Sequence, residues 1–177
     1  MPQKVTEPLE AQIRQFLVDT IRPVEMHGYD PQQTDPTAGD FLPISNDWSD
    51  YGDTYPVIVV QENNGPTIPN SGNTNVNGIQ GDGSGTNQTA VHPITVSVQS
   101  TQDGDYLNNV DYQTLVTDIY AECRFQLKDV DAVDEALYTG DLTPPTQTRS
   151  NEETDSGSTV TWLQRQGTVP VGFRYTP

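Results

Sequence analysis

Four consecutive β-branched residues, from Val57 to Val60, form the most apolar run of the chain, directly after Tyr55 and Pro56. Such a run predicts a β-strand that is buried on both faces, extending over residues 57–62. Pro56 can open a strand but cannot lie inside a central one. Because a strand covered on both faces needs a helix on at least one side, we expect an α+β domain organised around this strand.

The second strong constraint is charge, since 25 Asp and Glu residues stand against 8 Lys and Arg residues and give a net charge of −17. Asp outnumbers Glu, and lysine occurs only as Lys4 and Lys128. Such a surface repels itself at low salt and also repels nucleic acid. At about 1 M salt the Debye length falls to about 3 Å, which screens most of this repulsion. The charge therefore indicates a protein of a salt-saturated cytoplasm, with an acidic protein of an ordinary cell as the alternative.

The length of 177 residues favours a single domain spanning residues 1–177. Hydrophobic residues make up 32% of the chain, below the usual value of about 45–50%, so we expect a small core and long loops. No run approaches the roughly 18 apolar residues that a membrane span requires, and no secretory signal is visible. We therefore expect a soluble, intracellular protein with no membrane contact.

Two segments have apolar residues at helical spacing, residues 6–22 and residues 111–127. Asp111 is the expected N-cap of the second helix. Residues 91–100 and 160–175 instead alternate between apolar and polar positions, as half-buried strands do. Gly167 predicts a bend or bulge in the last strand. The expected fold is a small antiparallel or mixed sheet with the two helices packed on one face, and residues 130–138 are expected to add a short helix.

The predicted core collects the apolar positions of these elements. It consists of Leu9, Ile13, Phe16, Leu17, Val57, Ile58, Val59, Val60, Ile94, Val96, Val98, Leu115, Ile119, Cys123, Val171 and Phe173.

Three long segments lack periodicity and are expected to be irregular loops: residues 24–54, 63–90 and 139–158. Loops of this length are uncommon in a compact domain unless they have a function. Residues 63–90 contain too few apolar side chains to fold on themselves, so we expect contacts with other subunits to order them. Scattered apolar side chains in the loops are the candidate interface residues: Trp48, Tyr51, Ile68, Val76 and Ile79.

The sequence shows no arrangement typical of an enzyme. His27 and His92 lie in no nucleophile motif, and Cys123 lies on the apolar face of a predicted helix, where a buried inert thiol is expected. The glycine-rich residues 81–85 lack the Lys-Ser/Thr pair of a phosphate-binding loop. Acidic pairs or triplets within residues 47–53, 103–105 and 129–131 could hold a hard cation, but so acidic a chain produces such clusters by composition alone. We therefore predict a protein that is not an enzyme, with no catalytic residue, cofactor or metal.

The order of the predicted elements resembles that of the tail terminator, or tail completion, proteins of long-tailed viruses. The resemblance rests on the helix at residues 9–21, the aromatic-Pro-apolar strand at 55–60, the strand at 94–98, the helix at 112–127 and the strand at 169–175. These segments cover somewhat under half of the chain.

The resemblance implies a structural virion protein, assembled in the host cytoplasm. It would form a homo-oligomeric ring of six subunits on the head-proximal end of the tail. It would contact the tail tube protein and the neck or head–tail connector protein, and viral DNA would pass through the ring without specific binding. The acidic composition would place the host among halophilic archaea. We also expect a net negative pore surface, supplied by acidic loops such as residues 47–53 or 151–155.

Two other interpretations remain open. Within the same class, the protein could be a neck or head–tail stopper protein. In a different class, it could be an acidic halophilic enzyme or ligand-binding domain, which would require an apolar pocket with convergent polar groups.

Overall fold

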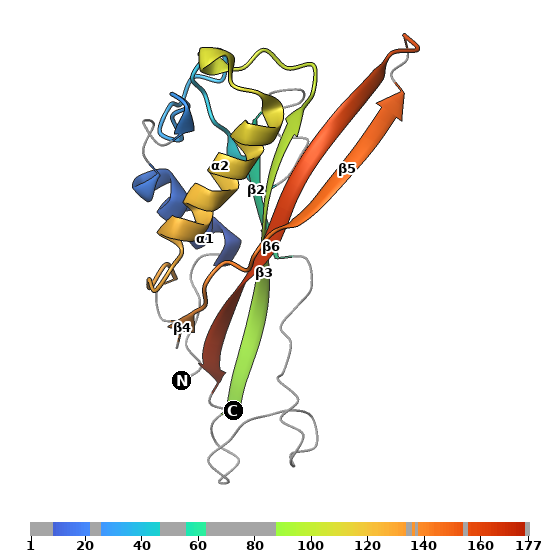
Figure 1. The fold of residues 1–177 in the computed structure, drawn as a ribbon. Helices are drawn as coiled ribbons and strands as arrows, with labels where there is room; N and C mark the ends of the chain where they lie inside the picture. Colours follow the sequence, from blue (N-terminus) through green and yellow to red (C-terminus); the bar gives the residue numbers. More distant parts are fainter. Residues whose placement is uncertain are drawn as a thin grey trace.

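The computed structural model describes residues 9–21, 26–46, 56–62, 88–133, 136, 138–153 and 156–175. Two helices and six strands form an α+β fold in which both helices cover one face of a mixed sheet (Figure 1). The helices are α1 (Leu9–Thr20) and α2 (Tyr112–Gln126). The strands are β1 (Ile44–Ser45), β2 (Val57–Glu62), β3 (Gln88–Thr101), β4 (Tyr138–Thr139), β5 (Thr146–Glu153) and β6 (Thr159–Tyr175). The predicted fold class is thus confirmed. None of the described helices is long and apolar enough to cross a bilayer.

The sheet has the order β1-β2-β3-β6-β4, and β5 pairs with β6 on the same side as β4. Only β1 and β2 are parallel; the other pairs are antiparallel. β2 is buried from Val57 to Val60, as the apolar run predicts. It lies one position from the β1 edge, however, and the long β3–β6 pair forms the middle of the sheet.

β3 and β6 pair in one unbroken register, from Gln88 opposite Tyr175 to Thr101 opposite Trp162. Pro93 lies opposite Pro170 inside this ladder. In an antiparallel pair of strands, hydrogen-bonded and non-hydrogen-bonded residue pairs alternate. Gln102 and Thr161 form a hydrogen-bonded pair, because the Gln102 backbone N–H donates to the Thr161 carbonyl at 2.9 Å. Counting along the register from there makes Pro93 and Pro170 a non-hydrogen-bonded pair. Neither proline therefore removes a hydrogen bond between β3 and β6, which explains how both are tolerated mid-strand.

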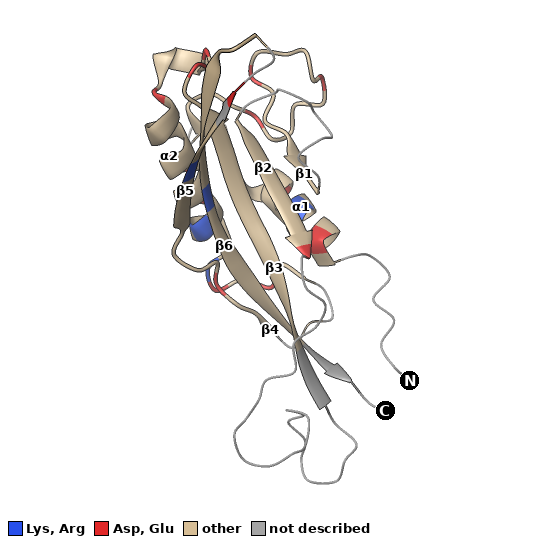
Figure 2. Ribbon diagram, turned by 90° about the vertical axis from the view of Figure 1, so that its right-hand side faces the viewer, with Lys and Arg blue, Asp and Glu red and all other residues tan. Residues whose placement is uncertain are grey.

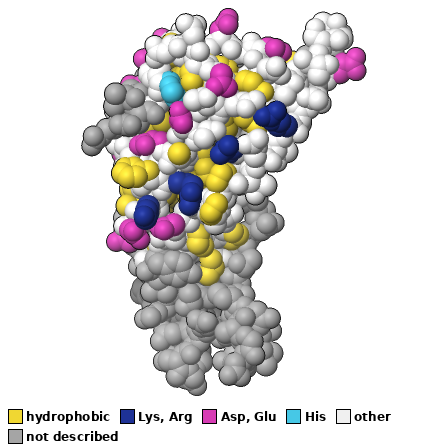
Figure 3. Space-filling view, viewed as in Figure 1, with side chains coloured by type: hydrophobic (Ala, Val, Ile, Leu, Met, Phe, Trp, Pro, Cys, Tyr) yellow, Lys and Arg dark blue, Asp and Glu magenta, His cyan; other side chains and the backbone are white. Residues whose placement is uncertain are grey.

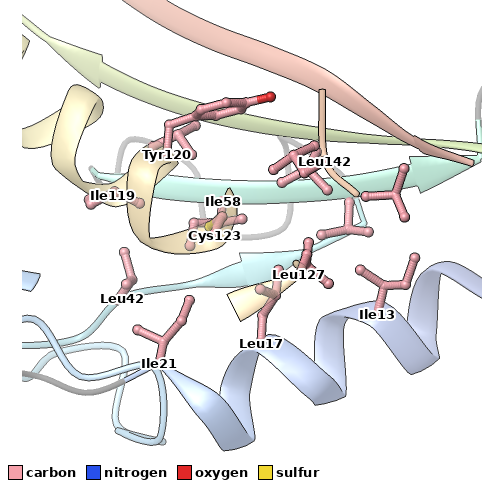
Figure 4. Close-up of a cluster of buried hydrophobic side chains, with 14 of the residues drawn as sticks. Ile13, Leu17, Ile21, Leu42, Ile58, Ile119, Tyr120, Cys123, Leu127 and Leu142 are labelled. Atoms are coloured by element: carbon pink, nitrogen blue, oxygen red, sulfur yellow. The ribbon is translucent and has the colours of Figure 1, made fainter. Parts of the chain in front are cut away.

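The core lies between the helices and the sheet, where α1 packs on β1 and β2 and α2 packs on β3 and β6. Figure 4 shows Ile13 and Leu17 of α1 directed towards Cys123 and Leu127, with Ile58 of β2 among them. All predicted core residues whose side chains are described are buried except Phe16, which is partly buried against the cluster. The side chain of Phe173 lies outside the described residues.

α2 begins as predicted, because the Asp111 carboxylate accepts hydrogen bonds from the backbone N–H groups of Gln113 and Thr114 at 2.9 and 3.3 Å. Two aromatic residues of the first predicted loop fix that loop to the body: Tyr29 is 3% exposed and Phe41 is 7% exposed. The Tyr29 hydroxyl also accepts a hydrogen bond from the backbone N–H of Leu107 at 3.1 Å.

Several predictions about local structure were wrong. Residues 24–54 are not entirely irregular, because β1 occupies residues 44–45. Residues 139–158 are not one loop, because β4 ends there and β5 occupies residues 146–153; likewise, β3 already begins at residue 88. Residues 130–133 are not helical, and Asp129 before them has a left-handed φ of 52°.

Gly167 produces no bulge in the β3–β6 pair, since that register runs past it without a break. A Cβ at this position would lie 2.0 Å from the Tyr120 hydroxyl oxygen. The glycine therefore makes room for the Tyr120 side chain beneath α2.

Candidate interaction surface

β5 is a free edge strand. Among the described residues it pairs only with β6, and all of its described side chains are exposed on both faces of the sheet. Beyond Thr161, whose carbonyl accepts from the Gln102 backbone N–H, residues 159–160 of β6 pair with β5 alone among the described residues, so the two strands project past the body as a two-stranded arm (Figure 1). An edge strand of eight residues leaves a row of backbone N–H and C=O groups available to another chain.

Four basic side chains lie beside this edge: Arg124, Lys128, Arg149 and Arg165. We call them the basic row. The register places Arg149 opposite Leu163 and Arg165 opposite Gln147, so both arginines project from the helix-covered face of the sheet. Arg124 of α2 donates from Nε to the carbonyl of Leu142 at 3.1 Å, which holds it over the segment that leads into β5.

Lys128 completes the basic row, directly after the C-cap of α2 at Leu127. Figures 2 and 3 show these basic groups running along the junction of α2 with β5 and β6. The only other basic residue with a described side chain is Arg14, on α1.

The basic row is not neutralised within the described part of the chain. The only ion pairs there are His27 with Asp118 and His92 with Glu62. Arg165 also has a buried Nε that meets no hydrogen-bond partner among the described groups. In a chain of net charge −17, a cluster of cations without carboxylate partners is a notable feature.

Phe125 adds an apolar group to the same helix end. Its side chain is 72% exposed, and it is the exposed large hydrophobic residue of the described chain. Aromatic residues and arginines are the side chains that most often dominate the binding energy of protein interfaces. Phe125 follows Arg124 about 100° further round the helix, so the C-terminal end of α2 presents an exposed aromatic ring next to the side that carries Arg124.

The opposite edge of the sheet is acidic. α1 packs on β1 and β2, and residues 26–46 lead into β1 at this edge. Together these segments contain five carboxylates, which we call the acidic edge: Glu10, Asp19, Asp30, Asp35 and Asp40. Arg14 is the single base of these two segments.

The carboxylates of the acidic edge accept hydrogen bonds only from neutral local donors, so their charge is retained. Asp19 accepts from the Gln15 amide at 2.9 Å, and Asp40 accepts from the Gln33 amide at 3.1 Å. Asp35 accepts from Thr37, whose side chain and backbone lower the pKa of that carboxyl.

The side chains that could take part in catalysis do not come together at one site. His27 Nε2 lies 2.7 Å from Asp118 Oδ2, and His92 Nδ1 lies 2.8 Å from Glu62 Oε1, on opposite ends of the helix layer. Cys123 is fully buried, and burial raises the pKa of its thiol to about 12, as expected for an inert core residue.

The structure describes only some of the other predicted site residues. No group of three or more metal-ligating side chains occurs among the described residues, which include the acidic pairs near residues 103–105 and 129–131. The candidate interface residues Trp48, Tyr51, Ile68, Val76 and Ile79 lie outside the described residues, as do residues 47–53 of the proposed pore surface.

Sequence reasoning missed the basic row and the β5 edge. The four cations come from three separate segments, and only the fold brings them together.

The chain matches no protein-family model, and no curated protein matches it either.

Proposed function

We propose that this protein is a structural subunit of a virus tail, which forms a ring on the head-proximal end of the tail tube and joins the tube to the neck. The order α1, β2, β3, α2, β6 is the order on which the resemblance to tail terminator proteins rests. The observation that carries the proposal is β5, a free and doubly exposed edge strand on a projecting arm.

The action of such a ring depends on interface geometry and involves no chemical reaction. Each subunit offers one surface to the preceding neighbour and another to the next, and the contacts close when the rotation per subunit divides a full turn. A closed ring on the tube end then covers the surface that another tube subunit would need. The loops outside the described residues are further candidates for these contacts.

The acidic composition supports a halophilic host, and it sets the conditions of the test. We expect a closed particle of about six subunits in about 3 M KCl, because repulsion between subunits of charge −17 is screened there. We expect dissociation in about 0.1 M KCl. Sedimentation velocity gives the mass, and electron microscopy of the same sample shows whether a central opening is present.

A monomer at all salt and protein concentrations would overturn the ring, and an open filament would overturn the terminator role. The position in the virion needs a second assay, in which the ring is added to the tail tube protein of the same virus during polymerisation. A terminator should stop tube growth at substoichiometric amounts, whereas a neck or stopper protein should leave tube length unchanged.

A further inference from the structure

We propose that the basic row, together with Phe125, binds the acidic edge of a second copy of this chain, so that subunits associate head to tail. The inference rests on the proposed function, because it defines the contact between neighbouring subunits of the ring.

The first argument is the placement of charge in the sheet. The basic row lies at the β5 side, whereas α1, which carries Glu10 and Asp19 of the acidic edge, packs on β1 and β2 at the other end of the strand order. Two different surfaces on one subunit make a heterologous contact, which closes into a ring when the rotation per subunit divides a full turn. Two basic rows facing each other across a twofold axis would instead repel.

The second argument is that the cations have no carboxylate partner among the described residues. None of the basic row lies within 4.0 Å of a described carboxylate, and Arg165 keeps a buried Nε without a hydrogen-bond partner. Arginine binds carboxylates through a planar fork of donors, and such charge-assisted bonds are stronger than neutral ones. The carboxylates of the acidic edge are hydrogen-bonded only to neutral groups and retain their charge for such a contact.

The choice of partner follows from the net charge. Nucleic acid also carries the charge that a basic row attracts, but a chain of net charge −17 repels a polyanion as a whole. A second copy carries the same repulsion, and at molar salt the field extends only about 3 Å for either partner. Binding to phosphates by counterion release, however, weakens steeply at such salt concentrations. Phe125 favours a protein surface as well, because its apolar ring gains from burial at any salt concentration.

The test compares Arg149→Glu with Arg14→Glu in about 1 M KCl. Both substitutions lower the net charge by two, but Arg149 belongs to the basic row and Arg14 lies on α1 beside the acidic edge. We expect Arg149→Glu to weaken self-association by about tenfold or more, measured by sedimentation equilibrium, since it places like charges in contact. Arg14→Glu adds a carboxylate to the acidic edge, so it should leave the association constant unchanged or increase it, and the urea midpoint of each variant verifies the fold.

Two further variants separate the proposed contact from general repulsion. Asp19→Lys reduces the net negative charge, so general repulsion predicts stronger association, whereas the proposed contact predicts weaker association. Phe125→Ser leaves the charge unchanged and should also weaken association.

Three results would overturn the inference while leaving the ring intact. They are equal effects of Arg149→Glu and Arg14→Glu on association, stronger association of Asp19→Lys, or association that none of the four substitutions changes. Duplex DNA binding in the same salt that is lost in Arg149→Glu, with unchanged particle mass, would assign the basic row to nucleic acid. A monomeric wild type would refute the proposed function itself.

Discussion

Replacing Gly167 by alanine should destabilise the fold through one identifiable clash. The new Cβ would lie 2.0 Å from the Tyr120 hydroxyl oxygen, 2.7 Å from Thr143 Oγ1 and 2.9 Å from the Thr143 carbonyl oxygen. Tyr120 is 1% exposed and donates its hydroxyl to that same carbonyl at 2.9 Å, so the ring cannot move away without losing the hydrogen bond. Overpacking of a core costs about 1–3 kcal/mol, and a lost hydrogen bond costs about 0.5–1.5 kcal/mol. We expect the free energy of unfolding to fall by about 2–3 kcal/mol.

The assay is urea unfolding at a constant molar salt concentration, since urea is uncharged and does not alter screening. Gly39→Ala is the matched control, because a Cβ at Gly39 has no atom within 4 Å and its cost should stay within about 0.5 kcal/mol. In a Tyr120→Phe background the closest clashing atom is absent, so the cost of Gly167→Ala should fall by about 1 kcal/mol. An equal cost in both backgrounds, or a cost no larger than that of Gly39→Ala, would refute the proposed contact.

Three other predictions concern the core and the helix cap. Ile58→Ala should lower the free energy of unfolding by about 2–5 kcal/mol in the same urea assay, because Ile58 is 0% exposed beneath both helices; a loss under 1 kcal/mol would contradict its central position. Asp111→Ala should lower the thermal midpoint at neutral pH. The hydrogen bonds from Thr114 and Gln113 lower the pKa of Asp111 in the folded protein. The stabilisation is therefore present above the unfolded pKa of this carboxyl and is lost as the pH falls through its folded pKa. The thermal midpoints of wild type and variant should accordingly converge in acid. Cys123 should react with a thiol reagent only after unfolding, because its thiol is buried and burial raises its pKa to about 12; rapid labelling of the folded protein would contradict this.

The sequence predicts those elements that bury one face or both. The run from Val57 to Val60 and the helical spacing around Leu115 and Ile119 carry a periodic signal because half or more of each element faces the core. β5 could not be found in this way. The described side chains of β5 are exposed on both faces, so no apolar alternation marks it as a strand.

Other features depend on contacts between distant segments. Gly167 has the sequence context of a bulge, and only the structure shows that Tyr120 of α2 occupies the space that a side chain at this position would need. The basic row has the same origin, since the packing of α2 on β6 and the pairing of β5 with β6 bring Arg124 and Arg149 to the same side of the sheet. Composition predicts the acidic surface of the chain but not where its few cations gather.

The pairing of β6 also has a consequence for the kinetics of folding. The β3–β6 ladder joins residues 101 and 162 at one end and residues 88 and 175 at the other, so it must close a long stretch of chain before its hydrogen bonds form. β5 and β6 form a local hairpin, in which Glu153 pairs with Thr159. We expect this hairpin to form first and to present the other edge of β6 as a template for β3. β5 would then govern the refolding rate although it buries little surface. Stopped-flow refolding of Thr148→Pro should be slower than wild type while unfolding is little changed, and the reverse pattern would place the hairpin after the rate-limiting step.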